Sequence, residues 1–384
     1  MTGGSDRGLE PGRPADAPSA LVEQRRDHAA GVLAQTLENR DATAYVHVGT
    51  ERDPAIRYSC SPPANGLVAV AYDGTDGEWL IRTADGSDGH PAADLAAVFA
   101  DRGREGTILT PARIPHDAAL YLENAGFEVA STDAIERARA TKTAAEHERI
   151  AAVQRAASAG IRHAASLLAD ATVVDGRLAV TEGADDPVPL TPARVRTAID
   201  EAIVGAGAFP AGNTAINPST GPTAVDGEAL SPDEPIVLAV APRGPAGYYG
   251  GLVRTLIVDS DGGRERRVHV AVTQSFRSAR SLLTASSASV HTVAADLEAE
   301  VRSFGLDAGV EATVAGVGLE SRERPTNGDE IEPGAVIRLD VAARVDETSR
   351  LRIADVLVVT DEGERPDRLA APEHSLSPAA LLEP

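Results

Sequence analysis

Apolar residues in the first third of the chain alternate between helical spacing and short strand-like runs. Residues 20–38 repeat their apolar positions with the period of one helix face. Short apolar or alternating runs and further helical segments follow, at 44–48, 66–72, 78–81, 92–101, 106–109, 116–125 and 127–130. The pattern predicts a small α/β domain over residues 20–136. Residues 1–19, rich in Gly, Pro and charge without periodicity, are predicted to be a flexible tail.

A long amphipathic helix is predicted after Thr143. Thr143 and Glu146 form the sequence signature of a capping box, with the threonine at the cap and the glutamate at the third helical position. The apolar positions that follow share one helix face: Ile150, Val153, Ala157, Ile161, Ala164 and Leu168. Another helix is predicted after Thr191, which is followed by proline, and two more over 268–283 and 286–304.

Residues 235–255, PIVLAVAPRGPAGYYGGLVRT, predict two strands joined by a turn. The first strand is a Val-rich run at 236–241, and a turn rich in Pro and Gly follows it. The second strand is predicted over 248–258, where Gly250 and Gly251 indicate a bulge or a close approach of another part of the chain. Taken alone, the hairpin is as consistent with a plain buried core as with a functional site.

Three phrases in the C-terminal part share glycines and prolines with a known family. They are ATVAGVGLESRERP at 312–325, IEPGAVIRLDV at 331–341 and RIADVLVVTDEG at 352–363. Together with the Gly-Tyr and Arg-Thr pairs of the hairpin, they resemble the pita-bread metallopeptidase family: Xaa-Pro aminopeptidase, prolidase, methionine aminopeptidase and the metal-free creatinase. The resemblance implies a pita-bread domain over residues 137–363, preceded by the smaller α/β domain that prolidase-like and creatinase-like members carry.

The resemblance also locates the five positions at which active members of the family bind a pair of divalent ions. In this chain they are Val240, Gly251, Ala315, Asp340 and Ala354. A shift of register does not restore the missing ligands, because 235–258 contains no Asp or Glu and no His lies between 291 and 374. Hard divalent ions need several oxygen donors, so we predict no metal and no other cofactor. A mononuclear site built from Asp340, Glu323 and water is the less favoured alternative.

Several polar side chains are implied to lie in or beside the family's cleft. The substrate-contacting His position of the family falls at Asn217, whose amide can hold a carbonyl but cannot transfer protons near neutral pH. The candidate binding residues are Asn217, Tyr248, Tyr249, Arg254, Arg322 and Glu323. Packing is the simpler role for the two tyrosines and Arg254, and no catalytic residue is predicted.

The composition narrows the range of partners. The chain has 36 Lys and Arg residues against 58 Asp and Glu, a net charge of −22, and Lys142 is its single lysine. Abundant acid with almost no lysine is typical of proteins that work in concentrated salt, which screens like-charge repulsion. Nucleic acid is not an expected partner, because phosphate binding needs a basic surface. The basic cluster Arg264, Arg266 and Arg267 is predicted to be a solvated hairpin end.

The remaining composition signals concern the location of the protein and the end of the chain. Cys60 is the only cysteine, which excludes an intrachain disulfide. No apolar run is long enough to cross a bilayer, so a cytoplasmic protein without a membrane partner is expected. Residues 364–384, rich in Pro, Ala and charge, are predicted to be a second tail.

These observations favour a Xaa-Pro peptidase-like protein that has lost metallopeptidase activity and binds a peptide or protein, or acts as a regulatory homologue. Inactivated domains occur in the family, including in a histone-chaperone subunit. One alternative is a metal-independent hydrolase of a small peptide or amidino substrate that uses Arg322, Glu323, Asp340 and a tyrosine of the cleft. Another is a structural subunit of a homodimer, since the family commonly dimerises.

Overall fold

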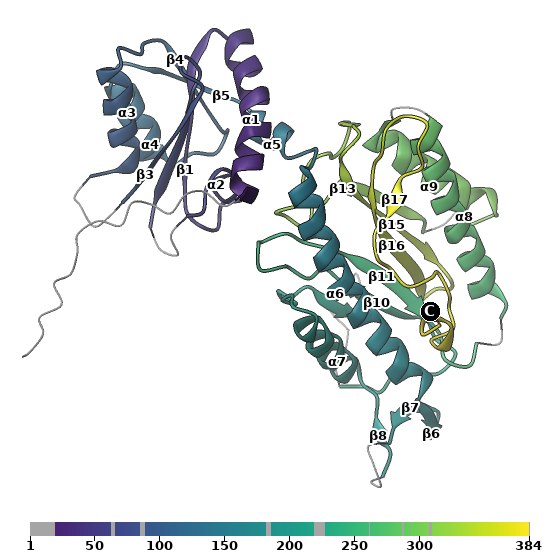
Figure 1. Cartoon of the computed structure of the whole chain (residues 1–384). Helices are drawn as coiled ribbons and strands as arrows, with labels where there is room; N and C mark the ends of the chain where they lie inside the picture. The colour runs from purple at the N-terminus through teal and green to yellow at the C-terminus, as the bar shows by residue number, and fades with distance from the viewer. Residues whose placement is uncertain are drawn as a thin grey trace, which may run out of the picture. The chain divides into compact units, whose positions relative to one another are not determined.

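The computed structural model describes residues 20–62, 66–84, 89–181, 186–218, 227–260, 262–285, 288–306 and 309–383. The chain divides into two compact units, Met1–Ala134 and Ile135–Pro384 (Figure 1). The predicted N-terminal tail, 1–19, lies outside the described residues. Within the described residues, no helix combines the length and the apolar character needed to cross a membrane.

The first unit is built on a five-stranded sheet with the order β3-β2-β1-β4-β5. β2 is antiparallel to β1 and β3, whereas β4 is parallel to β1 and β5. The strands are β1 (Ala42–Gly49), β2 (Val68–Asp73), β3 (Glu78–Thr83), β4 (Thr107–Thr110) and β5 (Glu128–Ser131). Each strand predicted for this part of the chain is therefore confirmed, within a few residues at its ends.

Helices cover both faces of this sheet (Figure 1). They are α1 (Ala20–Asn39), α2 (Pro54–Ser59), α3 (Pro91–Asp101) and α4 (His116–Asn124). Ala69 and Ala71 of β2 pack in a cluster with α3 and α4, whereas Val68 and Val70 pack with Ile56 of α2. Successive side chains of a strand point to opposite faces. β2, which is mostly apolar, therefore packs against helices on both faces of the sheet.

The second unit is built on a seven-stranded antiparallel sheet with the order β13-β15-β16-β11-β10-β9, and β17 pairs with β16. Its strands are β9 (Thr214–Ile216), β10 (Ile236–Val240), β11 (Leu252–Leu256), β13 (Glu311–Gly316), β15 (Val336–Arg344), β16 (Arg350–Val358) and β17 (Asp367–Arg368). Two small sheets join β6 (Thr172–Val174), β7 (Arg177–Val180) and β8 (Val188–Pro189), and β12 (Ala288–Ser289) with β14 (Glu330–Ile331).

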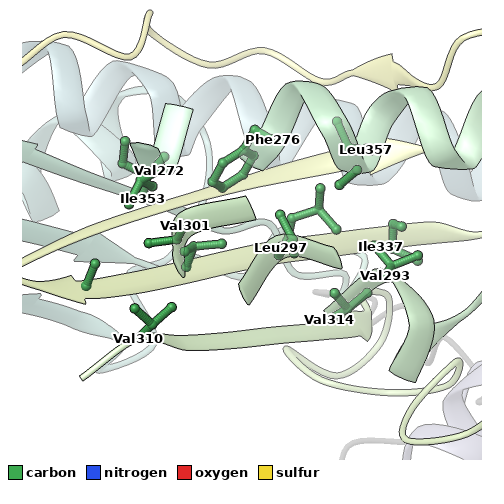
Figure 2. Close-up of a cluster of buried hydrophobic side chains, with 14 of the residues drawn as sticks. Val272, Phe276, Val293, Leu297, Val301, Val310, Val314, Ile337, Ile353 and Leu357 are labelled. Carbon is green, nitrogen blue, oxygen red and sulfur yellow. The ribbon is translucent and has the colours of Figure 1, made fainter. Parts of the chain in front are cut away.

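Two pairs of helices cover one face of the large sheet, which we call the outer face. α6 (Ala144–Ala169) and α7 (Pro192–Gly205) pack over β9, β10 and β11. α8 (Arg264–Ala285) and α9 (Val290–Ser303) pack over β13, β15 and β16, with Phe276 and Leu297 in the middle of the cluster (Figure 2). The unit also contains the short helix α5 (Ala134–Ala138), which spans the boundary between the units, and the 3₁₀ helix η1 (Ala379–Leu381).

The start of α6 confirms the predicted capping box. The Thr143 hydroxyl accepts a hydrogen bond from the Glu146 N–H, and the Glu146 carboxylate accepts one from the Thr143 N–H at 2.9 Å. The prediction for α8 is wrong at its beginning. The helix starts at Arg264, directly after Gly262 and Gly263 in positive-φ conformations. The basic cluster therefore lies in the first turn of a helix and not at a hairpin end.

The prediction of a C-terminal tail over residues 364–384 is also wrong for the described part, which ends at 383. β17 pairs with β16, and Leu381 lies in the core beneath α6 and α7. His374 Nε2 lies 2.6 Å from the carboxylate of Asp355 in β16. Composition suggested a tail, but a few specific contacts hold this segment against the sheet.

Asp355 is expected to make the folded protein sensitive to acid. Burial alone would raise the pKa of Asp355, but the charges of Arg254, His374 and Arg368 outweigh burial and hold this pKa well below its ordinary value. A carboxyl group whose pKa is lowered by folding stabilises the folded state above its unfolded pKa, and this contribution is lost as the pH falls through the folded pKa.

We therefore expect the urea midpoint of the protein to fall below about pH 4, where the unfolded carboxyl begins to bind its proton. Urea titrations at a series of pH values, followed by circular dichroism, measure this. Asp355→Asn is the matched variant, and its curve should be flatter on the acid side. An equally steep acid loss in the variant would show that other carboxylates carry the effect.

Candidate functional site

The sheet of the second unit carries a cavity of about 370 Å³ on its inner face, opposite the helices. Residues of β9, β13, β15 and β16 line it, together with the segments next to β9, β10 and β13. Its lining includes Ala241, Ala315, Arg322, Arg338, Asp340 and Arg352. Inner-face residues alternate with outer-face residues such as Ile337 and Leu339, which belong to the apolar core.

Asp340 lies between two arginines in this cavity. Arg338 Nη2 donates to Asp340 Oδ2 at 2.6 Å, and Arg352 donates through Nε to Oδ1 and through Nη2 to Oδ2, both at 2.7 Å. The Asp340 side chain is only 8% exposed. The hydrogen bonds to Asp340 raise the pKa of Arg352 further above its high ordinary value. Both carboxylate oxygens are therefore held by fixed positive charges.

The five positions implied by the family resemblance do not all meet in the cavity. Ala315 and Asp340 line it, and Ala354 lies beside Asp340 in the strand register. Gly251 is also close to it, because a Cβ there would lie 3.2 Å from Arg338 Nη1. Val240 does not join them.

Val240 points to the outer face and packs in the core with α6 and α7. Its neighbour Ala241 lines the cavity instead. A shift of one residue along a strand moves a side chain to the opposite face, and counting along the sequence does not resolve such a shift. Val240, the predicted first ligand position, therefore faces the core and not the cavity, and neither Val240 nor Ala241 can bind a metal.

Of the six candidate binding residues, only Arg322 lines this cavity, where it is exposed. Asn217 lines a separate cavity of about 730 Å³, and its side-chain oxygen accepts a hydrogen bond from the Val237 N–H at 2.7 Å. Its φ of 46° is one that Asn adopts more readily than most residues. The role of Asn217 in the described structure is to fix the end of β9 beside β10.

The two tyrosines support the inner face from outside the cavity. Tyr248 is fully buried, and its hydroxyl donates to Glu146 at the start of α6 at 2.8 Å. Tyr249 donates its N–H to the carbonyl of Gly318 at 2.7 Å. Packing and hydrogen bonding, the simpler roles for both residues, are what the structure shows.

Arg254 belongs to the outer face and does not reach the cavity. It is 1% exposed. It donates to Asp355 at 2.7 Å and to the carbonyls of Ala354 and Pro372. The prediction that Arg254 binds a ligand in the cleft is therefore wrong, because the strand alternation turns it toward the C-terminal segment.

Glu323 is also unavailable to a ligand. Lys142 Nζ lies 2.9 Å from its carboxylate and Arg139 donates to it, with the three side chains at most 6% exposed. Burial alone would raise the pKa of Glu323, but the charges of Lys142 and Arg139 outweigh burial and hold this pKa below its ordinary value. A Cβ at Gly318 would overlap the Glu323 carboxylate. This part of the shared phrase is accordingly retained for folding.

Gln154 of α6 explains the two glycines of the hairpin. Its amide donates to the Gly251 carbonyl at 3.1 Å and accepts from the Gly251 N–H at 2.9 Å. A Cβ at Gly250 would lie 2.9 Å from Gln154 Oε1. The predicted close approach is confirmed. β11 begins only at Leu252, because the backbone N–H and carbonyl of Gly251 are hydrogen-bonded to the Gln154 side chain.

The donors present do not fit a pair of divalent ions. The only carboxylate in the cavity lining belongs to Asp340, and two guanidinium groups hold it. The described part of the chain contains no group of three or more His, Cys, Asp or Glu side chains able to hold an ion. The mononuclear alternative also fails, because Glu323 is already paired with Lys142 and Arg139.

Sequence reasoning did not single out Arg338 and Arg352 as site residues. A signal was present, because Arg338 and Asp340 lie two residues apart within a mostly apolar strand and must share a face. Arg352 precedes Ala354 by the same interval. What the spacing does not give is the register that brings the two strands' arginines onto one carboxylate.

Comparison with known proteins identifies the family. The sequence profile of metallopeptidase family M24 matches residues 148–361. The chain belongs to family M24. The pita-bread fold expected from the shared phrases is thereby confirmed for this M24 protein. No curated protein matches the chain.

Solved structures with this M24 fold span both units. The prolidase from Pyrococcus horikoshii OT3 superimposes with a TM-score of 0.69 at 15% identity, covering 91% of this chain and 99% of that one. The Xaa-Pro dipeptidase from Bacillus anthracis gives 0.71 at 14%, covering 92% and 99%. The N-terminal domain of FACT complex subunit SPT16 from Cicer arietinum gives 0.65 at 12%, covering 95% and 99%. At these identities, the likeness shows the fold alone.

Proposed function

We propose that this M24 protein has lost metallopeptidase activity and binds a peptide, or a peptide segment of a protein, in the cavity beside Asp340. The observation that carries the proposal is the pair of arginines on Asp340. The family resemblance implies cations at this place, and here the protein supplies two cations of its own. A metal ion would have to displace them and would meet their repulsion.

The cavity itself supports a binding role. Its volume of about 370 Å³ lies within the range of small-ligand sites. Ala215, Ala241 and Ala315 leave the space open, and Thr313 and Ser321 add hydroxyl groups to its lining. The fold is also shared with a domain named as part of a complex subunit, which fits a binding role. The ligand could serve recognition alone or the regulation of an active relative.

The metal-independent hydrolase gains no support from the geometry. A carboxylate that serves as a general base must be free to take a proton from substrate, but Glu323 is enclosed by Lys142 and Arg139. Asp340 is engaged by Arg338 and Arg352. Arg322 is no substitute, because a guanidinium group has donors but no acceptor.

The loss of metallopeptidase activity is tested by metal content and turnover together. The full chain is equilibrated with Mn²⁺, Co²⁺ or Zn²⁺ in concentrated salt and dialysed, and bound metal is measured by mass spectrometry. Hydrolysis of Xaa-Pro dipeptides is measured on the same samples, with a prolidase as positive control. We expect substoichiometric metal and no turnover above the protein-free rate. Stoichiometric metal together with hydrolysis would overturn the proposal.

The binding role is tested by blocking the cavity. Ala315→Trp places an indole in the lining, whereas the exposed Ala295 of α9 offers a matched control, Ala295→Trp. Binding of a fluorescent peptide library is measured by anisotropy for the native chain and both variants. We expect binding by the native chain and by Ala295→Trp, and its loss in Ala315→Trp. Peptide binding that survives the block would place the ligand elsewhere and contradict this assignment.

A further inference from the structure

We infer that the ligand group held in this cavity is a carboxylate, bound by Arg338 and Arg352 with Arg322 at the rim. The inference rests on the proposed function, because it names the chemistry of the peptide that the same site accepts. The C-terminal carboxylate of a peptide is the source that the cavity fits. An acidic side chain within a folded partner is the other source of the same group.

The first observation is the local charge. Three arginines and one aspartate line the cavity, and its remaining lining residues are uncharged. The formal local charge is therefore positive by two, from three positive charges and one negative. The whole chain, by contrast, carries a net charge of −22. A positive cavity in an acidic protein concentrates anions and excludes metal cations.

The second observation is the supply of unused donors. A guanidinium has about five N–H groups in a planar fork, and Asp340 takes three hydrogen bonds from the two arginines together. Arg338 Nε has no hydrogen-bond partner among the described residues, but it is buried, so the donors open to a ligand are those on the Nη atoms that Asp340 leaves free. The Arg338 side chain as a whole is 18% exposed. Nothing in the described protein uses these remaining donors.

The third observation is the geometry already present. Arg352 binds Asp340 through Nε and Nη2, the paired contact that a guanidinium makes with a planar carboxylate. A second carboxylate can meet the free edges of the same two guanidinium groups. Asp340 keeps the two guanidinium groups close together by offsetting part of their mutual repulsion. It is therefore a positioning residue for the ligand arginines.

Size decides between the two sources of the carboxylate. A cavity of about 370 Å³ admits the end of a peptide but not a folded domain. A free C-terminus can enter it with its last side chains against Ala241 and Ala315. A carboxylate on a folded surface carries flanking residues that the same volume would also have to admit. We therefore assign the site to a peptide C-terminus.

The test uses isothermal titration of the full chain in the lowest salt that keeps it folded by circular dichroism. The probes are the tripeptide Ala-Ala-Ala, its C-terminal amide, succinate and inorganic phosphate. We expect the free acid to bind at least about tenfold more tightly than the amide, because the amide lacks the charge that the arginines pair. Added salt should weaken the binding of the acid.

Three variants separate a ligand role from a role in folding. Arg352→Gln and Arg322→Gln should each weaken the binding of the free acid by about tenfold and leave the binding of the amide unchanged. Arg322 is exposed and forms no ion pair within the described residues, so its variant should fold even if Arg352→Gln does not. The matched control is Arg350→Gln, on the same strand as Arg352. Arg350 lines the separate cavity of about 730 Å³ and not the cavity beside Asp340, so unchanged binding is expected.

The outcomes distinguish this inference from the proposed function. Equal binding of acid and amide that Ala315→Trp abolishes would overturn the carboxylate assignment and leave peptide binding intact. Binding of succinate that Arg322→Gln weakens, without binding of any peptide, would support the carboxylate site and overturn the peptide function. Phosphate binding tighter than both carboxylates would overturn the assignment in favour of a phosphate site.

Discussion

Replacing Asp355 with alanine is expected to lower the free energy of unfolding by about 3–5 kcal/mol, the cost of leaving a buried charge without its partner. Arg254 is 1% exposed and donates to Asp355 at 2.7 Å. Without that carboxylate, the acceptors that Arg254 keeps among the described residues are backbone carbonyls, including that of Pro372. His374 also loses its partner, so the C-terminal segment should loosen. Urea titration followed by circular dichroism measures the loss.

Asp361 offers a matched control for this prediction. It is exposed in the segment that follows β16, and Asp361→Ala should change the free energy of unfolding by less than about 0.5 kcal/mol. Limited proteolysis adds a second readout, because the region after 364 should become cleavable in Asp355→Ala but not in the control. A loss below about 1 kcal/mol in Asp355→Ala would mean that the Arg254 charge finds other compensation.

Replacing Glu323 with alanine is expected to destabilise the protein by a similar amount, about 3–5 kcal/mol. Lys142 is fully buried and Arg139 is 6% exposed, and both pair with Glu323. Removing the carboxylate leaves the buried ammonium of the only lysine with one acceptor among the described residues, the carbonyl of Arg139. The free energy of unfolding is again measured by urea titration.

Glu320 provides a control that shares a partner with Glu323. Its carboxylate pairs with the same Arg139 at 2.7 Å, but the side chain is 47% exposed. Water screens such a pair, so Glu320→Ala should cost at most about 1 kcal/mol. If the two variants proved equally destabilising, burial would not be the reason for the effect. Glu323→Gln, which keeps the shape but not the charge, should fall between them.

The sequence alone predicted the local elements of this protein well, because local signals suffice for them. The capping box at Thr143 depends on a residue three positions further along the chain, and the close approach at Gly250 depends on the lack of a side chain on glycine. Both predictions are confirmed. The start of α8 and the packed C-terminal segment were missed. Composition describes an average over a segment, whereas contacts such as that of His374 with Asp355 involve single residues far apart in the chain.

The candidate site, too, was predicted from the sequence only in part. The sequence by itself determined that the implied two-ion centre lacks its ligands, because no register of residues 235–258 supplies an acid and no His lies between 291 and 374. Only the tertiary structure decided which side chains occupy the place of that centre. Strand alternation turned Val240 and Arg254 to the outer face, and the register of β15 with β16 brought Arg338 and Arg352 onto Asp340. The physical reason is that a segment without donor residues lacks them in every register. The face on which a side chain lies, and the residue it pairs with, are fixed only when the strands are aligned.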